Sequence, residues 1–134
     1  MTRIETDHKI TSNSQKQLFD FLTDLNNFEK LMPQDKIEKW SSDENQCEFT
    51  IKGMARIGLK KESQTEHELI KISSFGKVPF SFNLDIHIAE KPNNGAEAYM
   101  VFEGDINPFM KMMVVKPLTN FFNMLVTKAS EIKL

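Results

Sequence analysis

Histidine is the side chain best suited to acid–base chemistry near neutral pH, and this 134-residue sequence contains three of them. They are His8, His67 and His87, and no two have the spacing of metal ligands on one helical face. His67 and His87 fall on predicted polar positions, so we expect both to be solvated. His8 differs, because it shares one predicted strand face with Ile4 and Ile10. Two interpretations remain open: a hydrogen-bonded core histidine, or an acid–base or ligand-orienting group in a pocket.

Arg56 and Cys47 are further side chains with potential chemistry. Arg56 shares one predicted strand face with Met54 and Gly58. If this face points inward, Arg56 would need a carboxylate or an anionic ligand as a partner; the alternative is a position at the surface. Cys47 is the single cysteine, which excludes an internal disulfide and a cysteine-based zinc cluster, and we expect an inert buried hydrophobe. The sequence contains no Ser-His-Asp spacing, nucleophile elbow, phosphate loop or dinucleotide fingerprint. It therefore predicts no catalytic residue, no metal site and no cofactor.

The overall composition excludes several classes of protein. Hydrophobic residues make up 40% and charged residues 27%, a globular balance, and the length predicts a single domain, 1–134. The net charge is −2 with both signs mixed along the chain, so we expect no nucleic-acid partner. The N-terminus lacks the apolar core of a signal peptide, and the uncharged apolar stretch between Lys116 and Lys128 is too short to span a bilayer. We expect a cytoplasmic monomer or homodimer without stable membrane insertion.

Methionine and phenylalanine are unusually frequent. The chain contains 8 Met and 11 Phe but only 1 Trp and 1 Tyr, and most of the methionines follow residue 99. Methionine adapts its flexible thioether to varied apolar partners, and it also fills gaps in protein cores. Both interpretations, a ligand-binding surface and ordinary core packing, remain open.

Hydrophobic alternation predicts an opening strand and a later run of antiparallel strands. Residues 3–10 alternate with one charged face, and 37–106 reads as several strands with polar turns at 41–45 and 93–95. The clearest strand is 78–88, in which every second residue is apolar. We expect the inward side chains of this strand and the next to be Val78, Phe80, Phe82, Leu84, Ile86, Ile88, Ala98, Met100, Phe102, Gly104 and Ile106.

Two helical regions flank these strands. Ser14 and Gln17 have capping-box spacing, with Ser12 and Gln15 as the competing register, and they precede an apolar stripe and a second short helix. The pair Asn107-Pro108 predicts the start of a long helix that runs to about Ile132. Its apolar stripe is wide, so we expect the helix to be covered on several sides. Pro117 lies inside it and predicts a kink or a break.

The order of elements and several segments resemble the START-like superfamily, also called the polyketide cyclase/dehydrase and lipid-transport (SRPBCC) or helix-grip group. The resemblance covers the whole chain, and it rests on the opening strand into 14–25, the corner NFEKLMP at 27–33 and the ending GDINPFM at 104–110. The segment 111–125 is similar to small bacterial, cyclase-like members. The resemblance implies an α+β fold, in which a curved antiparallel sheet wraps around a long C-terminal helix, with two short helices after the first strand.

The resemblance also implies a cavity between the sheet and the last helix. Family members use it for lipids, hormones, polyketides or aromatic compounds, while others are enzymes or co-chaperones, so the fold alone does not assign a function. We expect binding of a small hydrophobic or amphipathic ligand. The alternatives are a cyclase, dehydratase or hydrolase acting on a hydrophobic substrate, and a co-chaperone-like interaction module with a filled cavity. The predicted ligand-binding residues are His8, Phe49, Ile51, Arg56, Phe82, Met100, Phe102, Met113, Pro117, Leu118 and Phe121.

Overall fold

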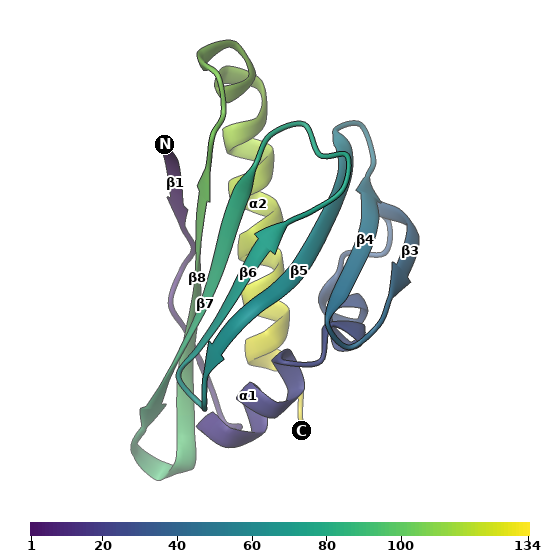
Figure 1. Cartoon of the computed structure of the whole chain (residues 1–134). Coiled ribbons are helices and arrows are strands. Elements are labelled where there is room, and N and C mark those ends of the chain that lie inside the picture. The colour runs from purple at the N-terminus through teal and green to yellow at the C-terminus, as the bar shows by residue number, and fades with distance from the viewer.

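A curved antiparallel sheet of eight strands lies against one long C-terminal helix (Figure 1). The computed structural model describes residues 1–134, apart from the side chain of Asn94. The strands are β1 (Thr2–Glu5), β2 (Lys9–Thr11), β3 (Ile37–Ser42), β4 (Gln46–Ile51), β5 (Ala55–Thr65), β6 (Leu69–Ser74), β7 (Phe82–Lys91) and β8 (Gly95–Gly104). The helices are α1 (Gln15–Leu22), η1 (Leu25–Leu31), η2 (Pro92–Asn94) and α2 (Pro108–Glu131).

The sheet has the order β1-β8-β7-β6-β5-β4-β3, and β2 pairs with β8 beside β1. Each long strand from β3 to β8 pairs with the next one along the chain, which is the meander that short turns favour. The first strand, β1, pairs with the last strand, β8, and so lies at one edge of the sheet. The expected α+β architecture, with two short helices between β2 and β3, is confirmed.

The two strands with the clearest alternation pack as predicted. Their inward side chains from Phe80 to Ile88 and from Ala98 to Ile106 are buried against the helix. The first of these strands begins at Phe82, later than the predicted residue 78, because Gly76 has a positive φ and Pro79 offers no backbone donor. In the turn between the strands, Asn93 has a φ of 64°, which is the left-handed conformation expected there. The side chain of Asn94 lies outside the described part of the chain.

The opening segment forms two short strands instead of the continuous strand that alternation predicts over 3–10. Three of its residues, 6–8, lie opposite only two residues of β8, 99–100. The extra residue is a β-bulge, and it exchanges the inner and outer faces of the strand. Ile10 is therefore 68% exposed, and its predicted place on the inner face with Ile4 is wrong.

Both predicted helix starts are confirmed by their capping hydrogen bonds. The Ser14 hydroxyl accepts from the Gln17 amide at 3.1 Å, and the Gln17 side chain accepts from the Ser14 amide at 2.9 Å. Asn107 caps α2, its side chain accepting from the amide of Met110. The sequence predicted a kink or a break at Pro117, and helix α2 continues through this residue without a break. The backbone carbonyl that loses its donor belongs to Met113, an exposed residue whose carbonyl water can satisfy.

Candidate functional site

The space between the inner face of the sheet and α2 is filled by side chains. The void there measures about 10 Å³, which is about the smallest space that can hold one water molecule. Aromatic rings from the sheet and from α2 close the space: the ring centroids of Phe49 and Phe121 are 5.9 Å apart, and those of Phe102 and Phe122 are 5.4 Å apart. The expected internal cavity is therefore absent from the described residues, because these phenylalanines meet across it.

Most of the predicted ligand-binding residues surround this filled space. Those that line it are Phe49, Ile51, Phe82, Phe102, Leu118 and Phe121. Met100 is also fully buried, but it lies outside this lining. Met113 and Pro117 instead line an outer groove, and His8 and Arg56 lie on the opposite face of the sheet.

The outer groove is open to solvent and has a volume of about 740 Å³. It lies between α2 and two turns, at 35–36 and 51–54. Volumes of about 300–1,000 Å³ are typical of small-molecule sites. The lining combines apolar side chains with a few polar ones: Asp35, Lys36, Ile51, Lys52, Gly53, Met54, Met110, Met113, Val114, Lys116, Pro117, Asn120, Phe121 and Met124.

Two tight turns hydrogen-bond to each other and form one wall of the groove. In the first turn, the Lys36 amide donates to the carbonyl of Pro33 at 2.9 Å. In the second, Gly53 adopts a φ of 77°, a conformation that side chains with a Cβ rarely take. The Lys52 amide then donates to the Lys36 carbonyl at 2.9 Å, which joins the turns. The wall is thus set by backbone geometry before any ligand is present.

The opposite wall is one face of α2, and it continues past the groove. A second, shallower depression of about 530 Å³ lies between α2 and residues 31–33. The two depressions share Asn120 and Met124. Methionines line both of them, namely Met32, Met54, Met110, Met113 and Met124. Met113 and Met124 are exposed there, whereas Met32 belongs to the core and Met54 and Met110 pack against it, so the methionines serve both as groove surface and as core packing.

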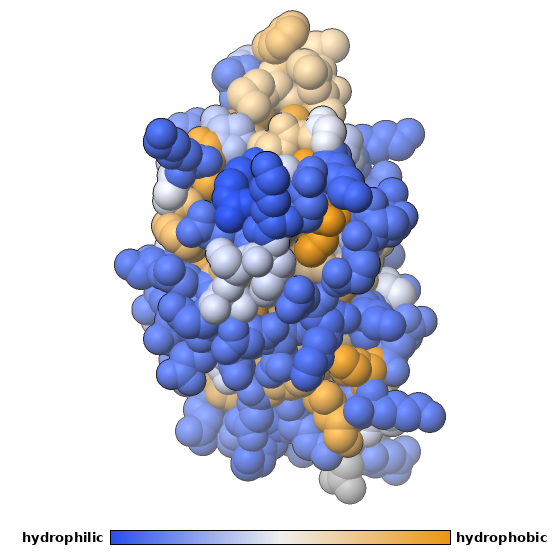
Figure 2. All heavy atoms as spheres, turned by 90° about the vertical axis from the view of Figure 1, so that its right-hand side faces the viewer, coloured by the Kyte–Doolittle hydropathy of each residue, from blue (hydrophilic) through white to orange (hydrophobic). Residues whose placement is uncertain are grey.

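The first turns of α2 extend beyond the sheet and leave large apolar side chains in solvent. Phe109 is 74% exposed, Met112 is 89% exposed and Met113 is 62% exposed. Figure 2 shows apolar surface gathered at this end of the molecule. The expectation that the whole helix is covered on several sides is therefore wrong for its first turns, because no strand reaches them (Figure 1). From Val114 onward, the helix buries its apolar stripe as expected.

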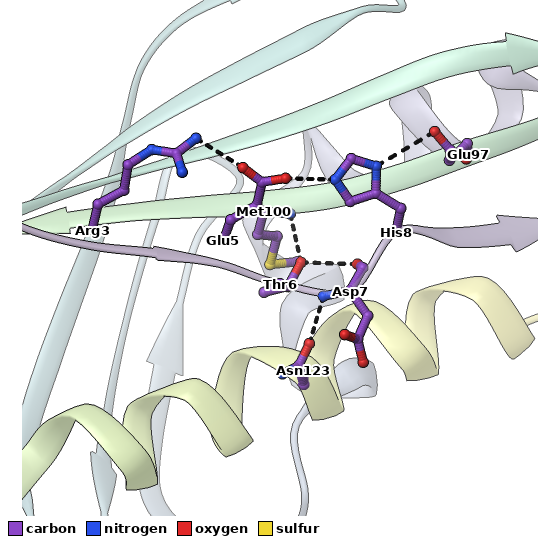
Figure 3. A network of polar contacts seen from close by, with 8 residues as sticks. All are labelled: Arg3, Glu5, Thr6, Asp7, His8, Glu97, Met100 and Asn123. Atoms are coloured by element: carbon purple, nitrogen blue, oxygen red, sulfur yellow. Dashed lines mark hydrogen bonds and ion pairs between the residues drawn. The ribbon is translucent and has the colours of Figure 1, made fainter.

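His8 lies on the outer face of the sheet, so its predicted place in the pocket is wrong. The bulge at 6–8 turns it outward, where its ring stacks on Tyr99 with a centroid distance of 3.9 Å. Its Nε2 lies 2.7 Å from the carboxylate of Glu5, and Nδ1 lies 3.6 Å from Glu97 (Figure 3). The hydrogen bond with Glu5 raises the pKa of His8 above its usual value, and the same bond lowers the pKa of Glu5. His8 is thus part of a surface ion-pair network.

The bulge is attached to the long helix on its other side. The amide of Asp7 donates to the side-chain oxygen of Asn123 at 2.8 Å (Figure 3). Thr6 exchanges two hydrogen bonds of 2.9 Å with the backbone of Met100. The bulge is therefore held from both β8 and α2, although nothing in the local alternation signals it.

Arg56 lies at the surface, which was one of its two predicted positions. Its guanidinium donates to the carbonyl of Lys39 at 3.1 Å and to the Thr50 hydroxyl at 3.2 Å, and it lies 3.4 Å from Glu48. Cys47 is buried as expected, and burial raises the pKa of its thiol to about 12. No cluster of three or more His, Cys, Asp or Glu side chains able to hold a metal occurs in the described part of the chain. None of the helices described is long and apolar enough to cross a membrane.

The predicted ligand-binding residues include none of the polar side chains of the groove and only Met113 of its four methionines, so Met54, Met110 and Met124 were missed. Asn120 and Met124 follow Met113 and Pro117 on the same helix face, yet they fall outside the predicted apolar stripe. Met54 lies in a turn, where alternation carries no information. The signal available beforehand was the high methionine content near the C-terminus.

Several solved structures are similar to this one over nearly the whole chain. XoxI from Bacillus cereus matches with a TM-score of 0.74 at 11% identity, covering 98% of this chain and 94% of that one. TTHA0849 from Thermus thermophilus matches with a TM-score of 0.74 at 9% identity, covering 97% and 95%. Norcoclaurine synthase from Thalictrum flavum, solved in complex with dopamine and hydroxybenzaldehyde, matches with a TM-score of 0.72 at 14% identity, covering 97% and 84%.

No family model matches the sequence, and no curated protein does. At the identities of the structural matches, the likeness concerns the fold, since unrelated activities are carried by the same architecture. The chain is therefore an α+β protein with the helix-grip fold.

Proposed function

We propose that residues 1–134 form one START-like domain that binds a small hydrophobic or amphipathic molecule in the groove beside α2. The observation that carries this proposal is the open volume of about 740 Å³ lined by methionine, proline, valine and phenylalanine side chains. Each 100 Å² of apolar ligand surface removed from water there contributes about 2.5 kcal/mol. The filled interior, with a void of about 10 Å³, offers a ligand no comparable space.

Binding is favoured over catalysis by the positions of the reactive side chains. An enzyme needs at least two polar groups that converge on the substrate. His8 and Arg56, the strongest candidates from the sequence, lie on the other face of the sheet, and the polar side chains of the groove itself (Asp35, Lys36, Lys52, Lys116 and Asn120) are all exposed. We therefore propose a cytoplasmic binding protein, monomeric or homodimeric, that acts without a metal, a cofactor or nucleic acid.

A second candidate function is a co-chaperone-like interaction module. The closed interior favours it, because such a module keeps its cavity filled. The exposed side chains of Phe109 and Met112 would then belong to a protein-binding surface. The two candidates differ in whether a small molecule binds beside α2.

The test is displacement of an environment-sensitive apolar dye by a series of alkyl and aromatic compounds. We expect saturable dye binding, weakened at least about tenfold by Met113→Trp or Met124→Trp, each of which places an indole in the groove. Met112→Trp is the matched control, since Met112 directly precedes Met113 in α2 and is exposed but does not line the groove. The absence of saturable binding, or equal effects of all three substitutions, would favour the interaction module instead.

A further inference from the structure

The β-bulge at 6–8 connects the sheet to the long helix, and each of its three residues makes a different contact. Thr6 bonds to the backbone of Met100 in β8 through two hydrogen bonds of 2.9 Å. The Asp7 amide donates to the side-chain oxygen of Asn123 in α2 at 2.8 Å, and the His8 ring lies on the outer face of the sheet (Figure 3). A change at the His8 ring can therefore reach α2 through the neighbouring residue, Asp7.

The His8 ring has a carboxylate at each of its two nitrogens. Nε2 lies 2.7 Å from Glu5, and Nδ1 lies 3.6 Å from Glu97. Ionised carboxylates only accept hydrogen bonds, and a neutral imidazole has a single N–H donor. A neutral His8 thus leaves a nitrogen lone pair facing one of the two carboxylates, whereas the charged imidazolium has a donor for each. The geometry by itself favours the charged form of His8.

His8 is also the centre of a row of charged groups on the outer face. Arg3 lies 2.9 Å from Glu5 at one end of the row, and Lys91 lies 3.8 Å from Glu97 at the other. The charges alternate in sign along the whole row only when His8 is protonated. A neutral His8 leaves the two carboxylates on either side of the ring without a cation between them, which is unfavourable.

The other titratable groups around His8 lie on its neighbouring elements. Tyr99 of β8 stacks on the His8 ring at 3.9 Å, and His87 of β7 stacks on Tyr99 at 4.7 Å. Because β7 and the bulge lie on opposite sides of β8, the Tyr99 ring lies between the two histidines. The carboxylate of Asp7 points toward α2 (Figure 3), and Lys9 alternates with Ile10, which is exposed on the outer face. The two carboxylates at the ring nitrogens are therefore the groups that respond most directly to the charge of His8.

On the other side of the bulge, Asn123 belongs to the helix face that lines the two depressions. Its side chain lines the shallower depression beside α2, and the next residue, Met124, lines both. The contact between Asp7 and Asn123 thus attaches the opening segment of the chain to this face of the helix.

We infer that His8 is a pH-sensitive switch that controls how firmly the bulge holds α2 at Asn123. The protonated ring is bonded to Glu5 and attracted to Glu97, which fixes the bulge and keeps the Asp7 amide on Asn123. Loss of the proton weakens the hold from the outer face and leaves the bulge held by β8 and α2 alone. The hydrogen bond with Glu5 raises the pKa of His8, so the firm attachment extends to a higher pH than an unpaired histidine would allow. The inference goes beyond the proposed function and needs no ligand.

The first test measures hydrogen exchange of the Asp7 amide by NMR on both sides of the His8 titration, which is followed in the same samples. We expect the protection factor of this amide, corrected for the intrinsic effect of pH, to fall about two- to fivefold as His8 loses its proton, which is the range that an exposed ion pair supplies. In His8→Gln we expect no such fall. The control is His67→Asn, which replaces a histidine in the turn between β5 and β6 by a residue that tolerates its positive φ, and it should behave as the wild type does.

The second test follows the backbone amide shifts of α2 around Asn123. We expect these shifts to titrate together with the His8 ring in the wild type but not in Asn123→Ala, which removes the acceptor and keeps a good helix former at this position. A protection factor that does not depend on pH in the wild type, or that depends on it equally in His8→Gln, would overturn the inference. Shifts that titrate unchanged in Asn123→Ala would also overturn it, since α2 would then respond by another route. Each of these results would leave the proposed function standing.

Discussion

Phe121 separates the filled interior from the outer groove, because its side chain lines both. It is 4% exposed, and its ring stacks on Phe49 at 5.9 Å. Removing most of this side chain by Phe121→Ala would connect the interior with the groove. Phe122 is also 4% exposed and lines the interior, but it does not line the groove, so Phe122→Ala is the matched control.

The cost of Phe121→Ala follows from the buried area. A buried aromatic side chain removes about 150–250 Å² from water, which at about 25 cal/mol per Å² amounts to an upper estimate of about 4–6 kcal/mol. Measured costs for such truncations are about 3–5 kcal/mol. We expect both phenylalanine variants to lose stability in this range, measured by urea unfolding. A loss below about 1 kcal/mol for Phe121→Ala would contradict the packed wall described here.

Ligand binding distinguishes the two variants. Phe121→Ala enlarges the groove, so we expect it to bind a bulky apolar dye more tightly than the wild type does, whereas Phe122→Ala should not. A ligand at about 100 times its dissociation constant would return about 2.7 kcal/mol of the lost stability. Phe121→Leu is a milder version for the case in which the alanine variant does not fold. Equal dye affinities of the two alanine variants would refute the assignment of Phe121 as the separating wall.

Two further predictions concern the surface. Glu5 raises the pKa of His8, so His8 should titrate at a lower pH in Glu5→Gln, as measured by NMR. The ion pair stabilises the fold below the pKa that His8 has in the unfolded state, and this contribution is lost as the pH rises through the raised pKa of the folded state. An unchanged titration in Glu5→Gln would contradict the ion pair. Phe109→Ser should change the free energy of unfolding by less than about 0.5 kcal/mol because the ring is mostly exposed, whereas Leu118→Ala should cost about 2–5 kcal/mol; a large loss in Phe109→Ser would mean that the helix start is packed.

Local patterns in the sequence were sufficient for most of the fold. The alternation over residues 78–88 predicts which side chains of β7 are buried, because side chains in a strand point to opposite faces in turn. Ser14 with Gln17, and Asn107 with Pro108, predict the helix starts, because each motif satisfies free backbone donors within a few residues. These features depend on neighbours along the chain, so a single sequence carries them.

The candidate site was predicted less well, because it depends on contacts between distant segments. The position of His8 follows from the pairing of the opening segment with β8, which inserts one extra residue and reverses the face. Periodicity marks Phe49, Phe102 and Phe121 as inward-facing, but whether they enclose a cavity or fill it depends on how closely the sheet approaches the helix.

The groove itself joins elements that are far apart in the sequence. The turns around Lys36 and Gly53 become one wall through a backbone hydrogen bond, and they face a helix that begins more than 50 residues later. Composition indicated that methionines were in excess, yet their gathering on one surface required the tertiary structure. The sequence carries the identity and local geometry of each wall, whereas the space between the walls arises only when packing brings them to a set distance.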